Sequence, residues 1–452
     1  MLVSMSPCRL ACVGVAVWAI AGCGSASLRP DGGGGRGGGE GGAAGTAGAG
    51  TAGAGGTGTG GAGGAGTAGA GADGGADAST PCTDTTADPN HCGACGHSCL
   101  GGVCTMSVCQ PFPLATSTMD SPNHLQLVDG KLYALTESAI GNPQTGSGMR
   151  RVWQLDATTP STPTLIAGTP LNGVPSCVMG GTLFWAQAST TPRTINSCTL
   201  SSCAATSKAI VTGIANINDV WAGPYCDLGR NQIVWVLTDE AIYNNAIYRA
   251  PPSGANPQLV TTFVTARPTG STGFNWEIAP SNVYDSGNPD RIFVDLENYT
   301  AKTGTLYYIS TVSPNTAAIP LVTLAGIFDG MVAASDTTAL FTMFPGGVDT
   351  GPPKSWAAPL PNGVVSGAPP VFSSDVGFIG IVDATRFYGR VWGSASMPSD
   401  VLFRCTLPTC LNPVIITRGQ SDATAFTQDA TAVYWSTSQA PSFGFTVWKL
   451  AK

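Results

Sequence analysis

The sequence predicts an all-β fold, a seven-bladed β-propeller that follows a disordered Gly/Ala/Thr tether and a small disulfide-rich module. Three observations predict the propeller: a strand core that recurs about every 50 residues, further strands at fixed places in each repeat, and the lack of any long helical periodicity. The recurring cores are Leu132-Tyr133, Leu183-Phe184, Ile233-Val234, Ile292-Phe293, Leu340-Phe341, Phe387-Tyr388 and Val433-Tyr434.

Each repeat has room for four strands. A short apolar stretch such as Leu125–Val128 precedes the core, and a second strand follows it, at Val152-Trp153, Ile195-Asn196, Ile247-Tyr248, Leu306-Tyr307, Ser355-Trp356, Leu402-Phe403 and Val447-Trp448. Another strand often ends the unit, beginning at Thr164, Lys208, Gln258, Pro320 and Val414. Four short strands in each repeat are typical of propeller blades.

The last repeat, which ends at Lys452, lacks its closing strand. Phe112–Thr116 is similar to the closing strands of the other repeats, so we expect it to pair with the last repeat and close the ring. Closure of this kind removes sheet edges that otherwise invite aggregation. Two alternatives stay open at this point: a ring of six or eight blades, and two packed β-sandwiches with coincidental spacing.

Residues 1–22 are expected to be a lipoprotein signal peptide. Arg9 is the only charged residue before the apolar run Leu10–Ile20, and that run is too short to span a bilayer, which needs about 20 residues. It closes with Ile20-Ala21-Gly22-Cys23, which resembles the lipobox of bacterial lipoproteins. The resemblance implies cleavage before Cys23 and acylation of its thiol, which would attach the chain to the lipid bilayer. The alternative is an ordinary secretory signal with an incidental cysteine.

The residue after Cys23 bears on location. Gly24 is not the aspartate that retains many lipoproteins in an inner membrane, so the expected location is the cell envelope, at the outer membrane. No later segment offers 18 consecutive apolar residues. The folded part of the chain is expected to be tethered by lipid and, as part of an exported protein, to be exposed to an oxidising compartment.

Residues 23–80 form the predicted tether. Of the 61 glycines in the chain, 25 lie between Gly32 and Gly75, and Gly41–Ala72 carries no charge. A segment with such high backbone entropy and nothing to bury forms no packed core. As a random coil of about 50 residues it would span ~40 Å and serve as a spacer.

Residues 81–109 form the cysteine-rich module, with six cysteines at Cys82, Cys92, Cys95, Cys99, Cys104 and Cys109. An exported chain with an even number of cysteines favours disulfides. The alternative is a zinc site that uses Cys92, Cys95, His97 and Cys99. The run from Asp88 to Cys99 resembles a short cysteine-rich motif of secreted and surface proteins of myxobacteria and their relatives, for which no settled biochemical role is known.

Six further cysteines lie in the propeller, residues 110–452. Cys198/Cys203 and Cys405/Cys410 share the pattern C-T-L-x-x-C just after the second strand of two repeats. This position indicates bridges Cys198–Cys203 and Cys405–Cys410 across an outer turn. Cys177 and Cys226 precede the cores of neighbouring repeats, which favours a bridge between two blades.

Composition excludes one class of partner and offers little chemistry. With 20 Lys+Arg against 27 Asp+Glu and a net charge of −7, the chain lacks the basic face that nucleic-acid binding requires. No cofactor or metal site is expected, and no residue is assigned as catalytic. The loops that enter the innermost strands are where propellers place ligands. The candidate ligand-binding residues at those positions are His124, Asp219, Trp276, Asp329 and Asp422.

These observations favour a membrane-anchored, surface-exposed protein that binds a protein or a glycan through its propeller. One alternative is a hydrolase or lyase that acts on an extracellular polymer, with His124 as a base beside a funnel aspartate. Another is a structural lipoprotein of the envelope. The competing interpretation of the candidate residues is that the aspartates cap turns and that His124 is a solvated loop residue.

Overall fold

The computed structural model describes residues 84–452 with gaps at 119–120, 138–149, 168–173, 188–192, 215–223, 240–243, 265–275, 280–290, 299–302, 311–316, 326, 335–336, 345–353, 361–376, 384, 393–400, 408, 411, 421–422 and 440–443. The predicted signal peptide, the tether, Cys23 and Cys82 lie outside the described residues. Asp84–Lys452 belongs to one compact unit. Among the described residues, no helix is both long and apolar enough to cross a bilayer.

The propeller is built from antiparallel sheets whose strands follow one another along the chain. The described residues form seven such sheets, six of four strands and one of three. The first sheet contains β4 (Ser121–Val128), β5 (Lys131–Glu137), β6 (Arg150–Asp156) and β7 (Thr164–Ala167). The second contains β8 (Val174–Met179), β9 (Thr182–Gln187), β10 (Arg193–Thr199) and β11 (Lys208–Ile214). The short helices η2 (Leu200–Ser202) and α1 (Cys203–Thr206) connect β10 to β11.

The next four sheets repeat this arrangement. The third contains β12 (Tyr225–Asp227), β13 (Gln232–Asp239), β14 (Asn244–Ala250) and β15 (Gln258–Val264). The fourth contains β16 (Trp276–Ala279), β17 (Arg291–Asn298), β18 (Thr303–Ser310) and β19 (Ile319–Ala325). The fifth contains β20 (Ile327–Ala334), β21 (Thr338–Phe344) and β22 (Lys354–Pro359). The sixth contains β23 (Gly377–Val382), β24 (Arg386–Trp392), β25 (Leu402–Thr406) and β26 (Val414–Thr417).

The last sheet joins the two ends of the described chain. Its order is β27 (Ala423–Gln428), β28 (Ala432–Gln439), β29 (Gly444–Ala451) and then β3 (Phe112–Ser117). In the register of this closing pair, Phe112 lies opposite Lys449 and Ser117 opposite Phe445. The expected closure by the N-terminal strand is therefore confirmed.

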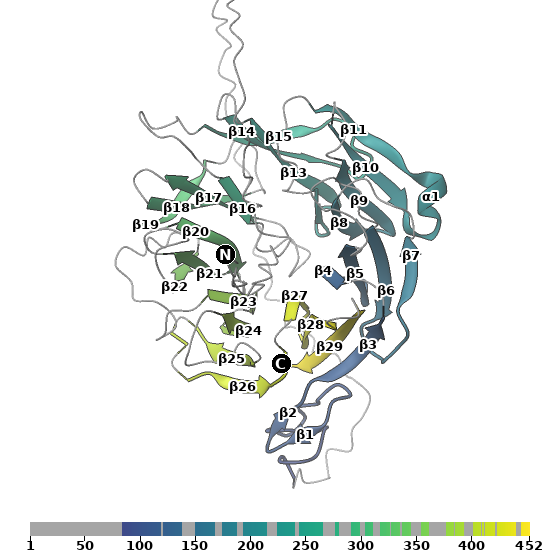
Figure 1. The fold of residues 1–452 in the computed structure, drawn as a ribbon, viewed down its shortest axis with the longest axis vertical. Helices are drawn as coiled ribbons and strands as arrows, with labels where there is room; N and C mark the ends of the chain where they lie inside the picture. Colours follow the sequence, from purple (N-terminus) through teal and green to yellow (C-terminus); the bar gives the residue numbers. More distant parts are fainter. Residues whose placement is uncertain are drawn as a thin grey trace, which may run out of the picture. The chain divides into compact units, whose positions relative to one another are not determined.

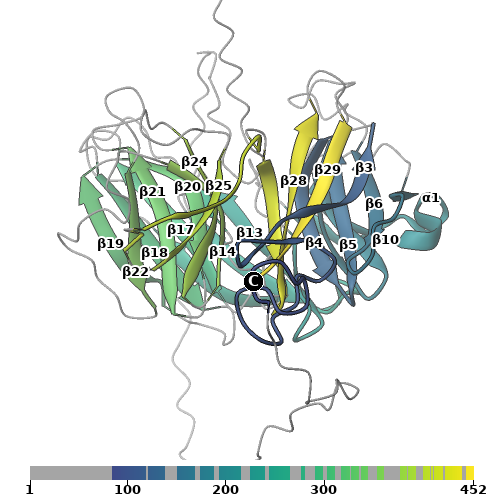
Figure 2. The same ribbon diagram turned by 90° about the horizontal axis from the view of Figure 1, so that it is seen from below.

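The sheets stand side by side around a ring, with their first strands toward the centre (Figure 1). First strands of neighbouring sheets contact each other in the pairs β4/β8, β8/β12, β16/β20, β20/β23, β23/β27 and β27/β4. Seen from the side, the strands of the sheets run across the thickness of the ring (Figure 2). This arrangement confirms the all-β propeller that the repeat predicts. The seven predicted strand cores all lie in the second strand of a sheet.

The core lies between neighbouring sheets. One cluster joins Leu114 of β3, Leu125 of β4 and Phe445 of β29, all at most 1 % exposed. Full burial of a leucine or phenylalanine side chain stabilises a fold by about 1.5–3 kcal/mol. Alternating side chains of the pleated strands face opposite neighbours, so each sheet contributes to the cluster on either side of it.

Polar groups also connect neighbouring sheets. The buried Gln126 side chain of β4 donates to the carbonyl of Val178 in β8 (3.0 Å) and accepts from its amide (2.7 Å). Lys449 Nζ in β29 donates to the carbonyl of Ala157 (2.9 Å), which directly follows β6. The first sheet is therefore connected to its neighbours on both sides of the ring by hydrogen bonds as well as by apolar contacts.

Candidate functional site

The candidate ligand residues lie on the inner strands rather than on the loops before them. His124 is in β4, Trp276 in β16 and Asp329 in β20, each the first strand of its sheet. The loop placement was therefore wrong for these three, because the strands extend further than their apolar residues indicate. β16 and β20 are neighbours around the ring, whereas β4 contacts β8 and β27. Asp219 and Asp422 lie outside the described residues.

His124 has the most informative environment of the candidates. It pairs with Leu135 of β5, and strand alternation puts it on the same face as Gln126, which bonds to the next sheet. Its Nε2 is buried, and burial lowers the pKa of the imidazole to about 3. The ring is therefore neutral at physiological pH, and a base this weak has little power to take a proton there. The interpretation of His124 as a solvated loop residue was wrong.

The other two histidines of the chain have structural contacts. Nδ1 of His91 accepts a hydrogen bond from the amide of Gly96 (2.9 Å). The ring of His97 lies against two carbonyls, with Nδ1 at Cys92 O and Nε2 at Lys452 O (2.8 Å). Each of the chain's three histidines therefore has at least one ring nitrogen that is buried or in contact with a backbone group.

Several aspartates cap turns between strands. Asp383 Oδ1 accepts from the amides of Thr385 (3.0 Å) and Arg386 (2.8 Å), and Asp429 Oδ1 accepts from the amide of Ala432 (2.7 Å). The Thr158 hydroxyl and amide hold the pKa of Asp156 below its usual value. These aspartates cap turns, but none of them is a candidate ligand residue, so the turn-capping interpretation of the candidate aspartates stays a prediction.

One further acid is buried against a cation. Asp227 is 2 % exposed and accepts from Arg230 Nη1 (2.9 Å) and from the Arg230 amide (2.9 Å). These two partners satisfy the charge of the buried carboxylate, which would be costly to bury unpaired. It is held in β12 and its hairpin, so it is not available to a ligand.

The cysteine module contains disulfides. The structure has Cys92–Cys104 and Cys99–Cys109, and Cys95 is also disulfide-bonded. The sulfurs of Cys92, Cys99 and Cys109 lie within 4.8 Å of one another, but zinc binds thiolates and each of these sulfurs is already in a disulfide. The residues therefore do not fit the zinc site that was the alternative interpretation.

In the propeller, the structure has the three bridges expected from the strand positions. Cys177–Cys226 connects the second and third sheets. Cys198–Cys203 and Cys405–Cys410 each close a short turn after the third strand of a sheet.

The sequence did not reveal a polar cavity beside the Cys198–Cys203 bridge. Its volume is about 600 Å³, within the range of small-ligand sites. Hydroxyl side chains and one cation dominate its lining, which includes Thr182, Ser197, Thr199, Thr206, Ser207, Lys208 and Ser253. Lys208 is exposed, so its ammonium group is available to an anionic group. The dense serines and threonines around Cys198–Lys208 are the signal in the sequence that could have pointed to it.

No protein-family model and no curated protein matches this sequence. Solved structures do resemble the fold. The β-propeller domain of the Trilobed protease from Pyrococcus furiosus is 10 % identical over 74 % of this chain and 97 % of its own, with a TM-score of 0.45. Dipeptidyl peptidase 4 from Porphyromonas gingivalis is 11 % identical over 69 % of this chain and 48 % of its own, with a TM-score of 0.40. Oligogalacturonate lyase from Vibrio parahaemolyticus is 10 % identical over 59 % and 70 %, with a TM-score of 0.40.

Proposed function

We propose that this chain is a surface-exposed glycan-binding protein of the cell envelope, held at the outer membrane by acylated Cys23 and without catalytic activity. The observation that favours binding over catalysis is that the side chains most able to act as bases or nucleophiles, the histidines and cysteines, are engaged in structural contacts. All three histidines lie in the described part of the chain, and each is buried or bonded to backbone. The described cysteines are disulfide-bonded.

The polar cavity beside Cys198–Cys203 is the binding site in this proposal. Glycans present hydroxyl groups, and several serines and threonines line the cavity. Lys208 adds a cation, which favours glycans that carry carboxylate or sulfate groups. We therefore propose acidic polysaccharides as the ligand class. If no polysaccharide binds, a protein ligand is the next candidate.

Retention on immobilised polysaccharides tests this proposal. We expect the chain to be retained by acidic polysaccharides and not by neutral ones, with no release of reducing ends. Lys208→Ala removes the only cation among the described residues that line the cavity and is expected to weaken retention about tenfold or more, since a hydrogen bond to a charged group contributes about 1.5–3 kcal/mol. Lys131→Ala is the matched control, since Lys131 is an exposed lysine of another sheet.

Three results would count against the glycan proposal. Equal retention of the Lys208→Ala and Lys131→Ala variants would remove the cavity as the site. Release of reducing ends would make the protein an enzyme. Absence of retention on every polysaccharide would leave a protein ligand or a structural role.

Cys23→Ser tests the anchor separately. With two or three acyl chains on Cys23, at ~0.8 kcal/mol per buried methylene, the wild-type chain should remain with membranes. The variant is expected to lose incorporated palmitate and to move to the soluble fraction, while its folded part is unchanged. Ser25→Ala, two residues away, is the control. Palmitate labelling that survives Cys23→Ser would contradict the anchor.

A further inference from the structure

We infer that the cysteine module has a mechanical role in the propeller: it is a clasp that holds the closing strand β3 on β29. The module is defined here as Asp84–Cys109, including its hairpin β1 (Cys104–Thr105) and β2 (Val108–Cys109). The module contacts the two strands that close the ring, β29 and β3.

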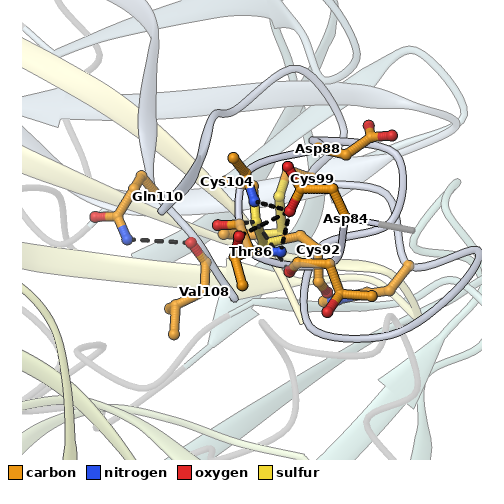
Figure 3. The surroundings of a disulfide bond; sticks show 12 residues. Asp84, Thr86, Asp88, Cys92, Cys99, Cys104, Val108 and Gln110 are labelled. Carbon is orange, nitrogen blue, oxygen red and sulfur yellow. Dashed lines mark hydrogen bonds between the residues drawn. A yellow bond between two sulfur atoms is a disulfide. The ribbon is translucent and has the colours of Figure 1, made fainter. Parts of the chain in front are cut away.

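The module is ordered by its own links. The disulfides Cys92–Cys104 and Cys99–Cys109 cross-link its loops. Asp84 Oδ1 accepts hydrogen bonds from the amide (2.8 Å) and the hydroxyl (2.7 Å) of Thr86. Figure 3 shows this turn beside Cys92, Cys99 and Cys104. A segment this small has too little core to order itself without such bridges.

On one side, the module contacts the end of β29. Nε2 of His97 lies 2.8 Å from the carbonyl oxygen of Lys452, directly after the strand. Leu450 and Ala451 lie in one buried cluster with Cys92 and Cys99 of the module. The partly buried Leu100 packs against this cluster. Lys452 is itself held, because its amide donates to Thr431 O (2.9 Å).

On the other side, the module contacts the start of β3. A Cβ on Gly101, where φ is +105°, would lie 3.1 Å from the ring of Phe112, the first residue of β3. A Cβ on Gly102 would lie 2.4 Å from Gln110 O. These two glycines allow the close approach, and the amide of Gln110 donates to Val103 O (2.8 Å). The same small module therefore touches both strands of the closing pair.

The contacts of the module strengthen the pairing of β3 with β29. β3 is the outermost strand of its sheet and is hydrogen-bonded only to β29 among the strands described. An outer strand of six residues is held by few ladder bonds, and local opening of such strands requires less free energy than global unfolding. The clasp adds a second attachment at the point where β3 begins and β29 ends.

Amide hydrogen exchange on the full chain tests the inference. Cys92→Ser/Cys104→Ser is expected to accelerate exchange in β3 and β29 about tenfold or more, while β9 and β10 of the second sheet keep their protection. Cys405→Ser/Cys410→Ser is the matched control, since it removes a disulfide of the sixth sheet and leaves the module and the closing sheet β27-β28-β29-β3 unchanged.

A second variant keeps both module disulfides and so covers the case in which the double variant does not fold. His97→Ala removes the contact with Lys452 and is expected to accelerate exchange in β3 and β29 about threefold or more. His91→Ala is its control, because His91 bonds to Gly96 within the module. Unchanged exchange in β3 and β29, or an equal rise in β9 and β10, would overturn the inference.

Discussion

Leu114→Asp is expected to lower the free energy of unfolding by about 5 kcal/mol or more and so to prevent the ring from closing. Leu114 is 1 % exposed in β3 and packs in the cluster that contains Leu125 and Phe445. Loss of a buried leucine side chain costs about 2–5 kcal/mol. Burial of an unpaired carboxylate adds several kcal/mol more. Equilibrium unfolding in urea, followed by tryptophan fluorescence, measures the change.

Thr116→Asp is the control for this experiment. Thr116 is an exposed residue of the same strand, so the same new charge there enters water and is expected to cost less than about 1 kcal/mol. A similar loss in both variants would show that charge anywhere in β3, rather than burial at Leu114, disturbs the closure. A loss below about 1 kcal/mol for Leu114→Asp would contradict the packing of β3 described above.

The second large effect is a loss of stability in weak acid that depends on His124. Burial lowers the pKa of the folded-state imidazole to about 3, whereas an unfolded histidine titrates near 6.5. Between these values the unfolded chain binds a proton that the folded chain does not. Stability is therefore complete above pH 6.5 and falls as the pH drops toward 3, by about 2–3 kcal/mol between pH 7.5 and pH 4.5.

His124→Gln should flatten this dependence. Asp84, Asp156 and Asp429 change little in this window. Hydrogen bonds, which for Asp429 outweigh the opposing effect of desolvation, hold their pKa values below the usual value, and their contribution to stability is lost only in stronger acid. Urea unfolding at pH 7.5, 6.0 and 4.5 is the measurement. His91→Gln, at a histidine of the cysteine module, is the control for the loss of one histidine. An identical slope in the wild type and in His124→Gln would contradict a buried neutral His124.

The periodic part of the fold could be predicted because each repeat contains the same arrangement of apolar residues. A core such as Leu340-Phe341 needs only its neighbours in sequence to indicate a strand, and the shared interval then indicates a repeated sheet. The Cys177–Cys226 bridge could be predicted for the same reason, since the two cysteines occupy equivalent places in adjacent repeats.

The environment of His124 could not be predicted in this way. Pro122-Asn123-His124 has the composition of a loop, but β4 includes these residues, with an irregularity in register between Pro122 and His124. β4 contacts β8 and β27 of the two neighbouring sheets, and these contacts contribute nothing to the local sequence pattern. The docking of the module likewise depends on the far end of the chain, at Leu450–Lys452, with no signal in the spacing of the cysteines.

The closing strand has a consequence for how the chain is made. Thr116 and Thr446, which lie opposite each other in β3 and β29, are separated by 330 residues. At ~5–20 residues per second, a ribosome needs about 15–65 s to make the intervening chain. β3 is thus among the first strands synthesised and the last to be paired, and a chain that stops early carries an open strand edge that can pair with another molecule. Completion of the final strand is therefore the step that lets β3 and β29 cover each other's open edge.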